Sequence, residues 1–193
     1  MFEIAAEANL VWELSRLCRA RAIEEMVNRL RDDQLLFLNV DPHDFTDPEF
    51  TPATLQVSDP GRVVIEITER TAIRNYPLFR DQLRVFREAG FRFAVDDAGS
   101  GYAGLGSIAN LEPDFIKLDI SLITGIDENF IKQNLVETMV RFANDQNAQV
   151  IAEGVETAEE FEAVKVESLN EVHAELLHRS GSLPLSSSPT TSA

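Results

Sequence analysis

The chain has 193 residues and a formal net charge of −16, from 33 Asp and Glu against 17 Lys and Arg. This length fits one domain with a substantial core and leaves no room for a second full domain. Because the chain is strongly acidic, the phosphates of DNA and anionic membrane surfaces repel it, and we expect neither as a partner. Any contact with phosphate is expected to need a cation between the two.

The first ten residues, MFEIAAEANL, lack the basic start and apolar core of a secretory leader. No apolar run approaches the ~18 residues that a membrane helix needs, so no membrane segment is expected. Cys18 is the only cysteine, which excludes an intramolecular disulfide and a cysteine-rich zinc site and leaves packing as its expected role. The sequence therefore predicts a cytoplasmic protein.

Helix-like and strand-like segments alternate along the chain. Apolar residues at helical spacing, among them Leu10, Leu14, Leu17 and Ile23, predict an amphipathic helix over residues 10–30. Short apolar runs, several rich in β-branched residues, predict strands over residues 35–40, 63–69, 91–97, 114–120 and 149–152. Each predicted strand is followed by a helix or a loop.

The helices after these strands show clear start and stop signals. One carries Phe79, Leu83 and Phe86 on one stripe and ends at Gly90. The others are predicted over residues 102–110, around 131–142 and over 158–168. The last begins with a capping box formed by Thr157 and Glu160.

Strands that alternate with helices pair in parallel, which leaves a doubly wound sheet or part of a (β/α)8 barrel. Polar residues lie at or near the C-terminal ends of all five predicted strands: Asn39, Glu66, Glu69, Asp96, Asp97, Lys117, Asp119, Glu153 and Glu156. A barrel brings all those ends to one face, whereas a doubly wound sheet gathers its ligands at one crevice. The pattern favours an α/β fold of incomplete (β/α)8 TIM-barrel type with about five parallel strands.

Five carboxylates, Glu66, Asp96, Asp97, Glu153 and Glu156, would crowd a small volume at such a face. At about 4 Å, each like-charge pair costs on the order of 4 kcal/mol at an effective dielectric of about 20. Divalent cations remove this conflict, and oxygen ligands without nearby His or Cys indicate Mg²⁺ or Mn²⁺. The sequence thus predicts a two-metal site of the kind that cleaves phosphodiesters.

Two further features bear on this site. Lys117, on the neighbouring strand, could orient a nucleophilic water or neutralise a phosphate. Gly99, Gly101 and Gly104 satisfy the G-x-G-x-x-G pattern of dinucleotide-binding folds. Because the charges of Asp96 and Asp97 just before it would repel a pyrophosphate, a glycine loop over the site is the favoured interpretation.

Four ordered motifs resemble those of the EAL domain, the bacterial cyclic di-GMP phosphodiesterase family. They are Glu66-Ile67-Thr68-Glu69, Asp96-Asp97-Ala98-Gly99-Ser100-Gly101-Tyr102, Phe115-Ile116-Lys117-Leu118-Asp119 and Ala152-Glu153-Gly154-Val155-Glu156-Thr157, and Asn39 matches a fifth. The resemblance implies a modified (β/α)8 barrel that hydrolyses cyclic di-GMP to linear pGpG with two Mg²⁺ or Mn²⁺ ions.

The resemblance also implies a role for each matching residue. Those that resemble metal ligands are Asn39, Glu66, Asp96, Asp97 and Glu153. Lys117 and Glu156 resemble the catalytic residues that support the water and the metal shell. Glu69 resembles the glutamate that stabilises the glycine loop, and that loop implies a homodimer.

The chain departs from the family pattern in several places. The Glu-Ala-Leu strand that names the family would precede Met1, and the Gln-Gly strand expected after Thr157 is absent. Ala98 replaces the phenylalanine usual after the paired aspartates. We therefore expect a partial EAL domain over residues 1–165, truncated at both ends, followed over residues 166–193 by a helix outside the family pattern and a disordered Ser/Thr/Pro tail.

Three hypotheses follow. The chain is a phosphodiesterase, or an inactive EAL fragment that binds cyclic di-GMP or a partner protein, or a truncation product whose open sheet edges leave strand groups unpaired.

Overall fold

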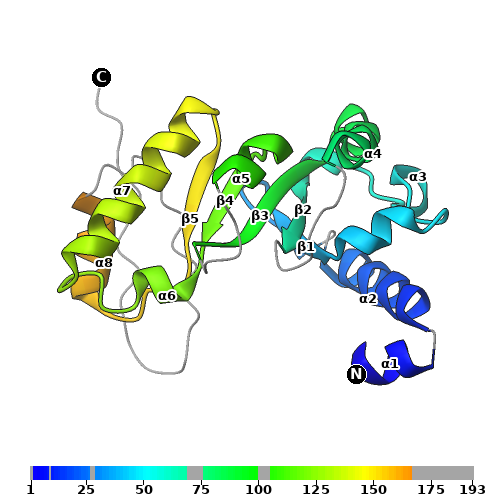
Figure 1. Ribbon diagram of the computed structural model, residues 1–193. Helices are drawn as coiled ribbons and strands as arrows, with labels where there is room; N and C mark the ends of the chain where they lie inside the picture. Colours follow the sequence, from blue (N-terminus) through cyan, green and yellow to red (C-terminus); the bar gives the residue numbers. More distant parts are fainter. Residues whose placement is uncertain (1, 9, 27–28, 69–75, 100–104, 167–193) are drawn as a thin grey trace.

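In the computed structural model, which describes residues 2–8, 10–26, 29–68, 76–99 and 105–166, five strands form one parallel sheet (Figure 1). The strands are β1 Leu36–Val40, β2 Val63–Thr68, β3 Arg92–Ala98, β4 Phe115–Leu118 and β5 Gln149–Ala152. They lie side by side in chain order, β1-β2-β3-β4-β5. A doubly wound sheet reverses its order at a switch point, whereas a barrel adds strands consecutively. The predicted barrel-like α/β fold is therefore confirmed.

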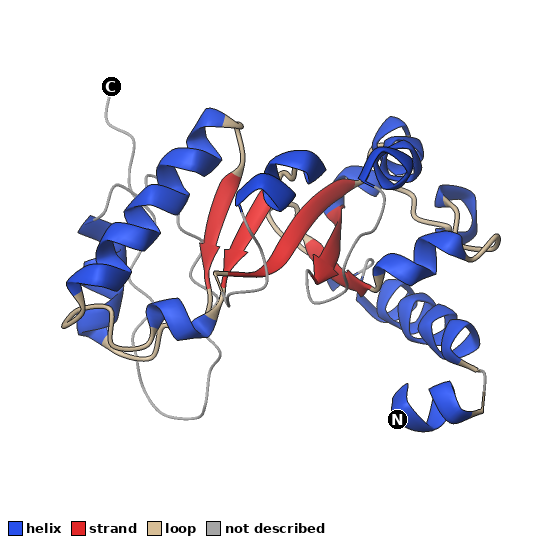
Figure 2. Ribbon diagram, viewed as in Figure 1, coloured by secondary structure: helices blue, strands red, loops and turns tan. Residues whose placement is uncertain are grey.

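Helices connect the strands and flank the sheet (Figure 2). They are α1 Phe2–Glu7, α2 Val11–Met26, α3 Pro52–Leu55, α4 Tyr76–Glu88, α5 Leu105–Leu111, α6 Ile120–Ile123, α7 Phe130–Asp145 and α8 Ala158–Val166, with 3-10 turns η2 Pro42–Thr46 and η3 Pro60–Arg62. Helices α2 and α3 lie near the β1 end of the sheet, and α7 and α8 lie near the β5 end. None of these helices is both long enough and apolar enough to cross a membrane.

The two faces of the sheet bury different sets of side chains. One face packs against the helices in a large core whose strand members include Ile65, Val95 and Ile116. The opposite face carries a smaller cluster of Val64, Ala94, Phe115 and Ile151, against which Leu35 and Phe37 pack. Side chains alternate along a strand, so the residue two positions beyond a member of this smaller cluster lies on the same face.

Helix α2 differs from its predicted orientation. Among the described members of the expected stripe, only Ile23 is buried, whereas Leu10, Leu17 and Met26 are 50%, 58% and 42% exposed. Cys18, expected to be a packing residue of this helix, is also exposed. The prediction of the buried face was therefore wrong.

An arginine explains the rotated helix. Arg19 is 5% exposed, and its Nη1 donates to Asp44 Oδ2 at 2.6 Å. Its guanidinium lies 4.3 Å above the centre of the Phe50 ring. One turn earlier, Arg16 binds Asp47 in two hydrogen bonds of 2.5 and 2.7 Å. Because a buried charge needs an ionised partner, these pairs turn the arginine side of α2 inward.

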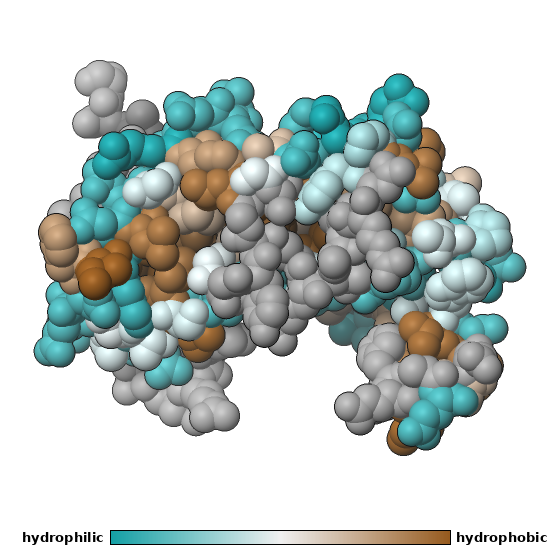
Figure 3. Space-filling model, viewed as in Figure 1, coloured by the Kyte–Doolittle hydropathy of each residue, from teal (hydrophilic) through white to brown (hydrophobic). Residues whose placement is uncertain are grey.

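Large hydrophobic side chains also lie on the surface near the β5 end. They are Ile120, Phe130, Ile131, Leu135 and Phe161, between 40% and 76% exposed. Figure 3 shows hydrophobic surface over α7 and α8 at this end of the molecule. This end of the molecule therefore exposes large apolar side chains in addition to those buried in the two core clusters.

Candidate metal centre

Two buried charged residues stand on the face of the sheet that carries the smaller apolar cluster. Glu66 in β2 is 2% exposed and Lys117 in β4 is 8% exposed. Each follows a member of that cluster, Val64 or Phe115, by two positions, so strand alternation aims both side chains to the same face. On this face, the apolar cluster is thus followed by a layer of charged side chains at the C-terminal ends of the strands.

Lys117 lies among carboxylates from three different strand ends. Its Nζ donates to Glu66 Oε1 at 2.9 Å. It also lies 2.5 Å from Glu153 Oε1 and 3.3 Å from Asp96 Oδ1. Glu153 follows β5 directly, and its N–H donates to the carbonyl of Leu118 in β4, which aligns the two strand ends. The parallel sheet therefore brings together Glu66, Asp96, Lys117 and Glu153, as the sequence predicts.

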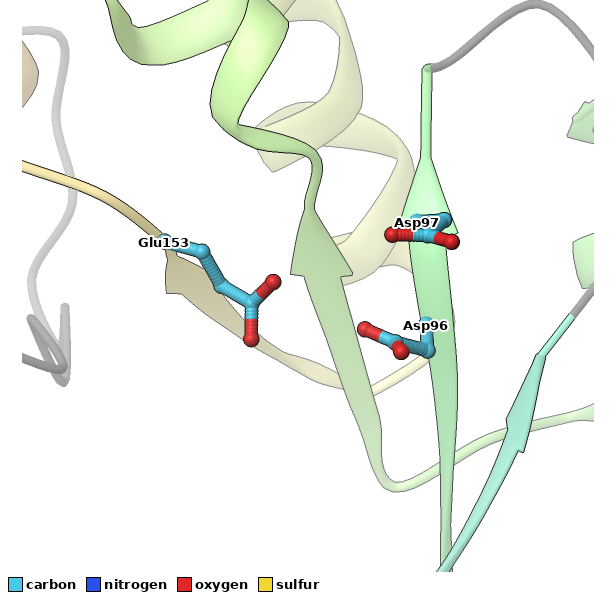
Figure 4. Close-up of side chains that lie close together, drawn as sticks. All are labelled: Asp96, Asp97 and Glu153. Carbon is cyan, nitrogen blue, oxygen red and sulfur yellow. The ribbon is translucent and has the colours of Figure 1, made fainter. Parts of the chain in front are cut away.

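An irregularity in β3 places the adjacent aspartates. In a regular strand, Asp96 and Asp97 would point to opposite faces. Here the register with β4 shifts between Val95 and Ala98, and Asp97 adopts a left-handed conformation with φ 57°. As a result, carboxylate oxygens of Asp96, Asp97 and Glu153 all lie within 4.8 Å of one another (Figure 4).

The charges of this cluster shift two pKa values. Burial is the main cause that raises the pKa of Glu66 to about 7, and the nearby charge of Asp96 adds to it, while the hydrogen bond from Lys117 opposes both. Burial lowers the pKa of Lys117, but the hydrogen bonds to Glu153 and Glu66 outweigh it and raise the pKa above its ordinary value. Lys117 is thus held as an ammonium ion.

The donor set fits a divalent cation. Glu66, Asp96 and Glu153 contact Lys117, and Asp97 contributes a fourth carboxylate beside Asp96 and Glu153. Asp96 Oδ1 is buried and lies 3.3 Å from Lys117 Nζ, but it accepts no hydrogen bond from the described residues. An oxygen acceptor left in this position is suited to a metal ion, and all-oxygen ligands favour hard cations such as Mg²⁺, Mn²⁺ or Ca²⁺.

The other predicted site residues lie at the margin of this cluster or outside the described chain. Asn39 pairs in register with Glu66, but its side chain is exposed. The side chain of Glu156 is exposed too, and its backbone N–H donates to Glu160. Glu69 and the glycine-loop residues 100–104 are outside the described residues. Their predicted roles stay predictions.

The structure adds two carboxylates near the strand ends whose contacts sequence reasoning missed. Asp119, predicted to continue β4, instead caps α6 by accepting the N–H of Ser121 at 2.8 Å. The Asp-x-Ser spacing after a strand is a signal that could have found this cap. Glu160 was predicted only as half of a capping box, yet it also accepts the N–H of Gly125 at 2.7 Å.

Two cavities lie away from the carboxylate cluster. One of about 440 Å³ lies between α4 and α5 and is lined by Tyr76, Arg80 and Arg87 among others. The second, of about 620 Å³, lies between α2 and α3, with Arg19 and Phe50 in its wall. Neither lining includes a residue of the cluster, so these cavities add nothing to the site.

Comparison with known proteins agrees with the geometry. The family model described as EAL domain matches residues 1–168. The cyclic di-GMP phosphodiesterase PdeR of Escherichia coli (strain K12) is 36% identical over 107 residues, which cover 55% of this chain and 16% of PdeR. The blue light- and temperature-regulated antirepressor BluF of the same strain is 30% identical over 102 residues, which cover 53% of this chain and 25% of BluF.

A solved structure shares the fold over most of the chain. Klebsiella pneumoniae BlrP1, in a complex with manganese and cyclic di-GMP at pH 6, matches with a TM-score of 0.79 and 29% identity, covering 90% of this chain and 46% of that one. A complex of BlrP1 with calcium and cyclic di-GMP matches with a TM-score of 0.77. The chain therefore spans less than half of BlrP1 and at most 25% of PdeR or BluF.

Proposed function

Because this chain belongs to the EAL domain family, we propose that it binds cyclic di-GMP and hydrolyses it to linear pGpG with Mg²⁺ or Mn²⁺. The observation that carries the proposal is the cluster of Asp96, Asp97 and Glu153 oxygens within 4.8 Å of one another, with Lys117 beside it. The name of PdeR and the manganese and cyclic di-GMP complex of BlrP1 support the substrate and the cation.

In this proposal the carboxylates at the strand ends hold two cations. The ligands are Glu66, Asp96, Asp97 and Glu153, with Asn39 at the neighbouring strand position. When bound there, two such cations would supply activation of a water molecule and charge stabilisation for the phosphodiester. Placement of the proposed ligands at the ends of neighbouring paired strands supports a spacing set before substrate binds, which favours an efficient site.

Lys117 and Glu156 have separate roles at this centre. Lys117 is held as an ammonium ion, so its N–H groups can orient the nucleophilic water or bind a phosphate oxygen. Glu156 lies on the exposed loop after β5, where its carboxylate can complete the metal shell from the solvent side. Glu66, with a pKa of about 7, can hold a proton near neutral pH until a cation displaces it.

The test is a turnover assay with purified protein, cyclic di-GMP and either Mg²⁺ or Mn²⁺, followed by chromatography of linear pGpG. We expect turnover by the wild type and loss of at least ~10²-fold in Lys117→Met, since electrostatic groups at a reaction centre contribute this much. Lys165→Met, an exposed lysine in α8, is the matched control and should keep full activity. Absence of pGpG with either cation would contradict hydrolysis.

A second candidate function is binding of cyclic di-GMP or a partner protein without turnover. It is favoured by the similarity to BluF, whose name describes an antirepressor. Calorimetry with cyclic di-GMP and Ca²⁺, the cation in one BlrP1 complex, separates the two candidates. Affinity in Ca²⁺ without pGpG in Mn²⁺ or Mg²⁺ would support the binding module.

We further propose that the glycine loop after Asp97 contributes to a homodimer, as the family resemblance implies. Gly99, the one loop glycine among the described residues, has φ +95°, a conformation that favours glycine. Sedimentation velocity at several protein concentrations tests this, and a monomer throughout would contradict it.

A further inference from the structure

Helix α6 lies against the two loops that follow the carboxylate-bearing strands β3 and β5. Gly99, directly after β3, and Gly154, directly after Glu153, both have positive φ, at +95° and +69°. A Cβ atom on Gly99 would overlap Leu122, and one on Gly154 would overlap Ile120. Glycine at these positions therefore lets α6 fit closely between the loops that carry Asp96, Asp97 and Glu153.

One buried carboxylate joins α6 to the loop after β5. Glu160 in α8 is 6% exposed, and its Oε1 accepts the N–H of Gly125, in the turn that follows α6, at 2.7 Å. Its Oε2 accepts the N–H groups of Glu156 and Thr157 at 3.0 and 3.2 Å. The two oxygens thus bind segments that are about 30 positions apart in the chain, while the hydroxyl of Thr157 accepts the N–H of Glu160 at 3.1 Å.

We propose that Glu160 is a positioning residue for the metal centre: its carboxylate fixes the loop after β5 to α6 and thereby holds Glu153 at metal-binding distance from Asp96 and Asp97. This inference rests on the proposed metal-dependent function. Glu153 lies three positions before Glu156, whose N–H Glu160 binds, and Gly154 between them lies against Ile120 of α6.

Both oxygens of Glu160 act as acceptors in this arrangement, Oε1 for Gly125 and Oε2 for Glu156 and Thr157. An amide has one acceptor oxygen and a donor NH₂, so it satisfies only one side of the bridge.

Three variants separate the bridge from helix capping and from charge. Glu160→Gln keeps the shape and loses one side of the bridge. Thr157→Ala removes the hydroxyl that caps α8 but leaves the N–H groups that Glu160 binds. Glu159→Gln makes the same chemical change on an exposed residue one position earlier. Glu160→Asp, too short to reach both segments, replaces Glu160→Gln if that variant does not fold.

Three readouts without substrate test the proposal: Mn²⁺ affinity, melting temperature and hydrogen exchange. By calorimetry with MnCl₂ we expect Glu160→Gln to weaken binding by ~10–100-fold, the usual effect of losing a group that orients a metal ligand. Thr157→Ala should lower the melting temperature and, like Glu159→Gln, leave the Mn²⁺ affinity unchanged. Hydrogen exchange at residues 153–157 and at Gly125 should accelerate in Glu160→Gln.

The outcomes distinguish this inference from the proposed function. If wild type binds Mn²⁺ and Glu160→Gln binds it equally well, the positioning role is wrong while the metal site stands. If Thr157→Ala weakens Mn²⁺ binding as much as Glu160→Gln, the effect belongs to the helix cap, which also overturns the role. If wild type binds no Mn²⁺, both the metal site and this inference fail.

Discussion

Lys117 contacts three carboxylates of the candidate site. Its ammonium group lies next to Glu66, Asp96 and Glu153. Burial is the main cause that raises the pKa of Glu66, and the nearby charge of Asp96 adds to it, against the opposing hydrogen bond from Lys117. The candidate site can therefore exchange protons and cations, and its stability should depend on pH.

Without divalent cations, we expect the free energy of unfolding to fall as pH rises. The pKa of Glu66 is about 7 in the folded protein against an ordinary 4.5, so between these values the folded state binds the proton that the unfolded chain releases. This contribution is complete below about pH 4.5 and lost as pH rises through about 7, and it amounts to about 3 kcal/mol. Urea denaturation in EDTA across this pH range measures it.

Glu66→Gln should remove that part of the pH dependence, because an amide does not titrate. Glu162→Gln, an exposed glutamate in α8, should leave the profile as in the wild type. Parallel profiles for wild type and Glu66→Gln would show that Glu66 does not carry a raised pKa.

At the scale of elements, the close packing of α6 against Gly154 leads to a prediction about stability. We expect Gly154→Ala to destabilise the protein by about 1–3 kcal/mol, because the new methyl group overlaps Ile120 and the backbone has a positive φ. Ile120→Ala in the same chain should recover part of the loss by relieving the overlap. Chemical denaturation of the two single variants and the double variant measures the coupling.

Gly106→Ala is the matched control for this substitution. Gly106 lies in α5, and a Cβ atom there would meet nothing within 4 Å. Alanine in a helix should stabilise the protein by about 0.5–1 kcal/mol. Equal effects of Gly154→Ala and Gly106→Ala would contradict the close fit of α6.

The sequence predicted the strands well and the short or rotated helices poorly. Each strand is an apolar run bounded by turn residues, so β5 was predicted at its observed bounds and the others within two residues. Helix α6 has four residues, too few to show a helical period. The buried side of α2 depends on Asp44, a partner 25 positions away from Arg19 that no local pattern reveals.

The candidate site likewise has some features that the sequence predicts and others that it does not. Strand alternation was enough to bring Glu66 and Lys117 together, because each lies at a fixed register in the sheet. The direction of Asp97 was not predictable, since it depends on a register shift and a positive φ. The bond from Gly125 to Glu160 joins two segments whose contact only the folded chain defines.

At the scale of the whole molecule, a net charge of −16 opposes folding through general repulsion. We therefore expect NaCl to raise the melting temperature by screening. At equal ionic strength, MnCl₂ should raise it further, because a ligand that binds the folded state adds about 2.7 kcal/mol at 100 times its Kd. Differential scanning calorimetry in the two salts measures both effects.

The variant Asp96→Asn, Asp97→Asn is designed to separate the two effects. It should respond to NaCl as the wild type does and lose the extra stabilisation by MnCl₂, because it removes two of the proposed ligands. An equal response of variant and wild type to MnCl₂ would mean that the cation acts only on the general charge.

The consecutive strand order has a consequence for how the chain is made. Each of β2 to β5 pairs with the strand synthesised just before it, so its partner has already left the ribosome when it emerges. The sheet can therefore grow in one direction during translation, one βα unit at a time. Glu153 emerges after Glu66, Asp96 and Asp97, so the carboxylate cluster is completed only when β5 has joined the sheet.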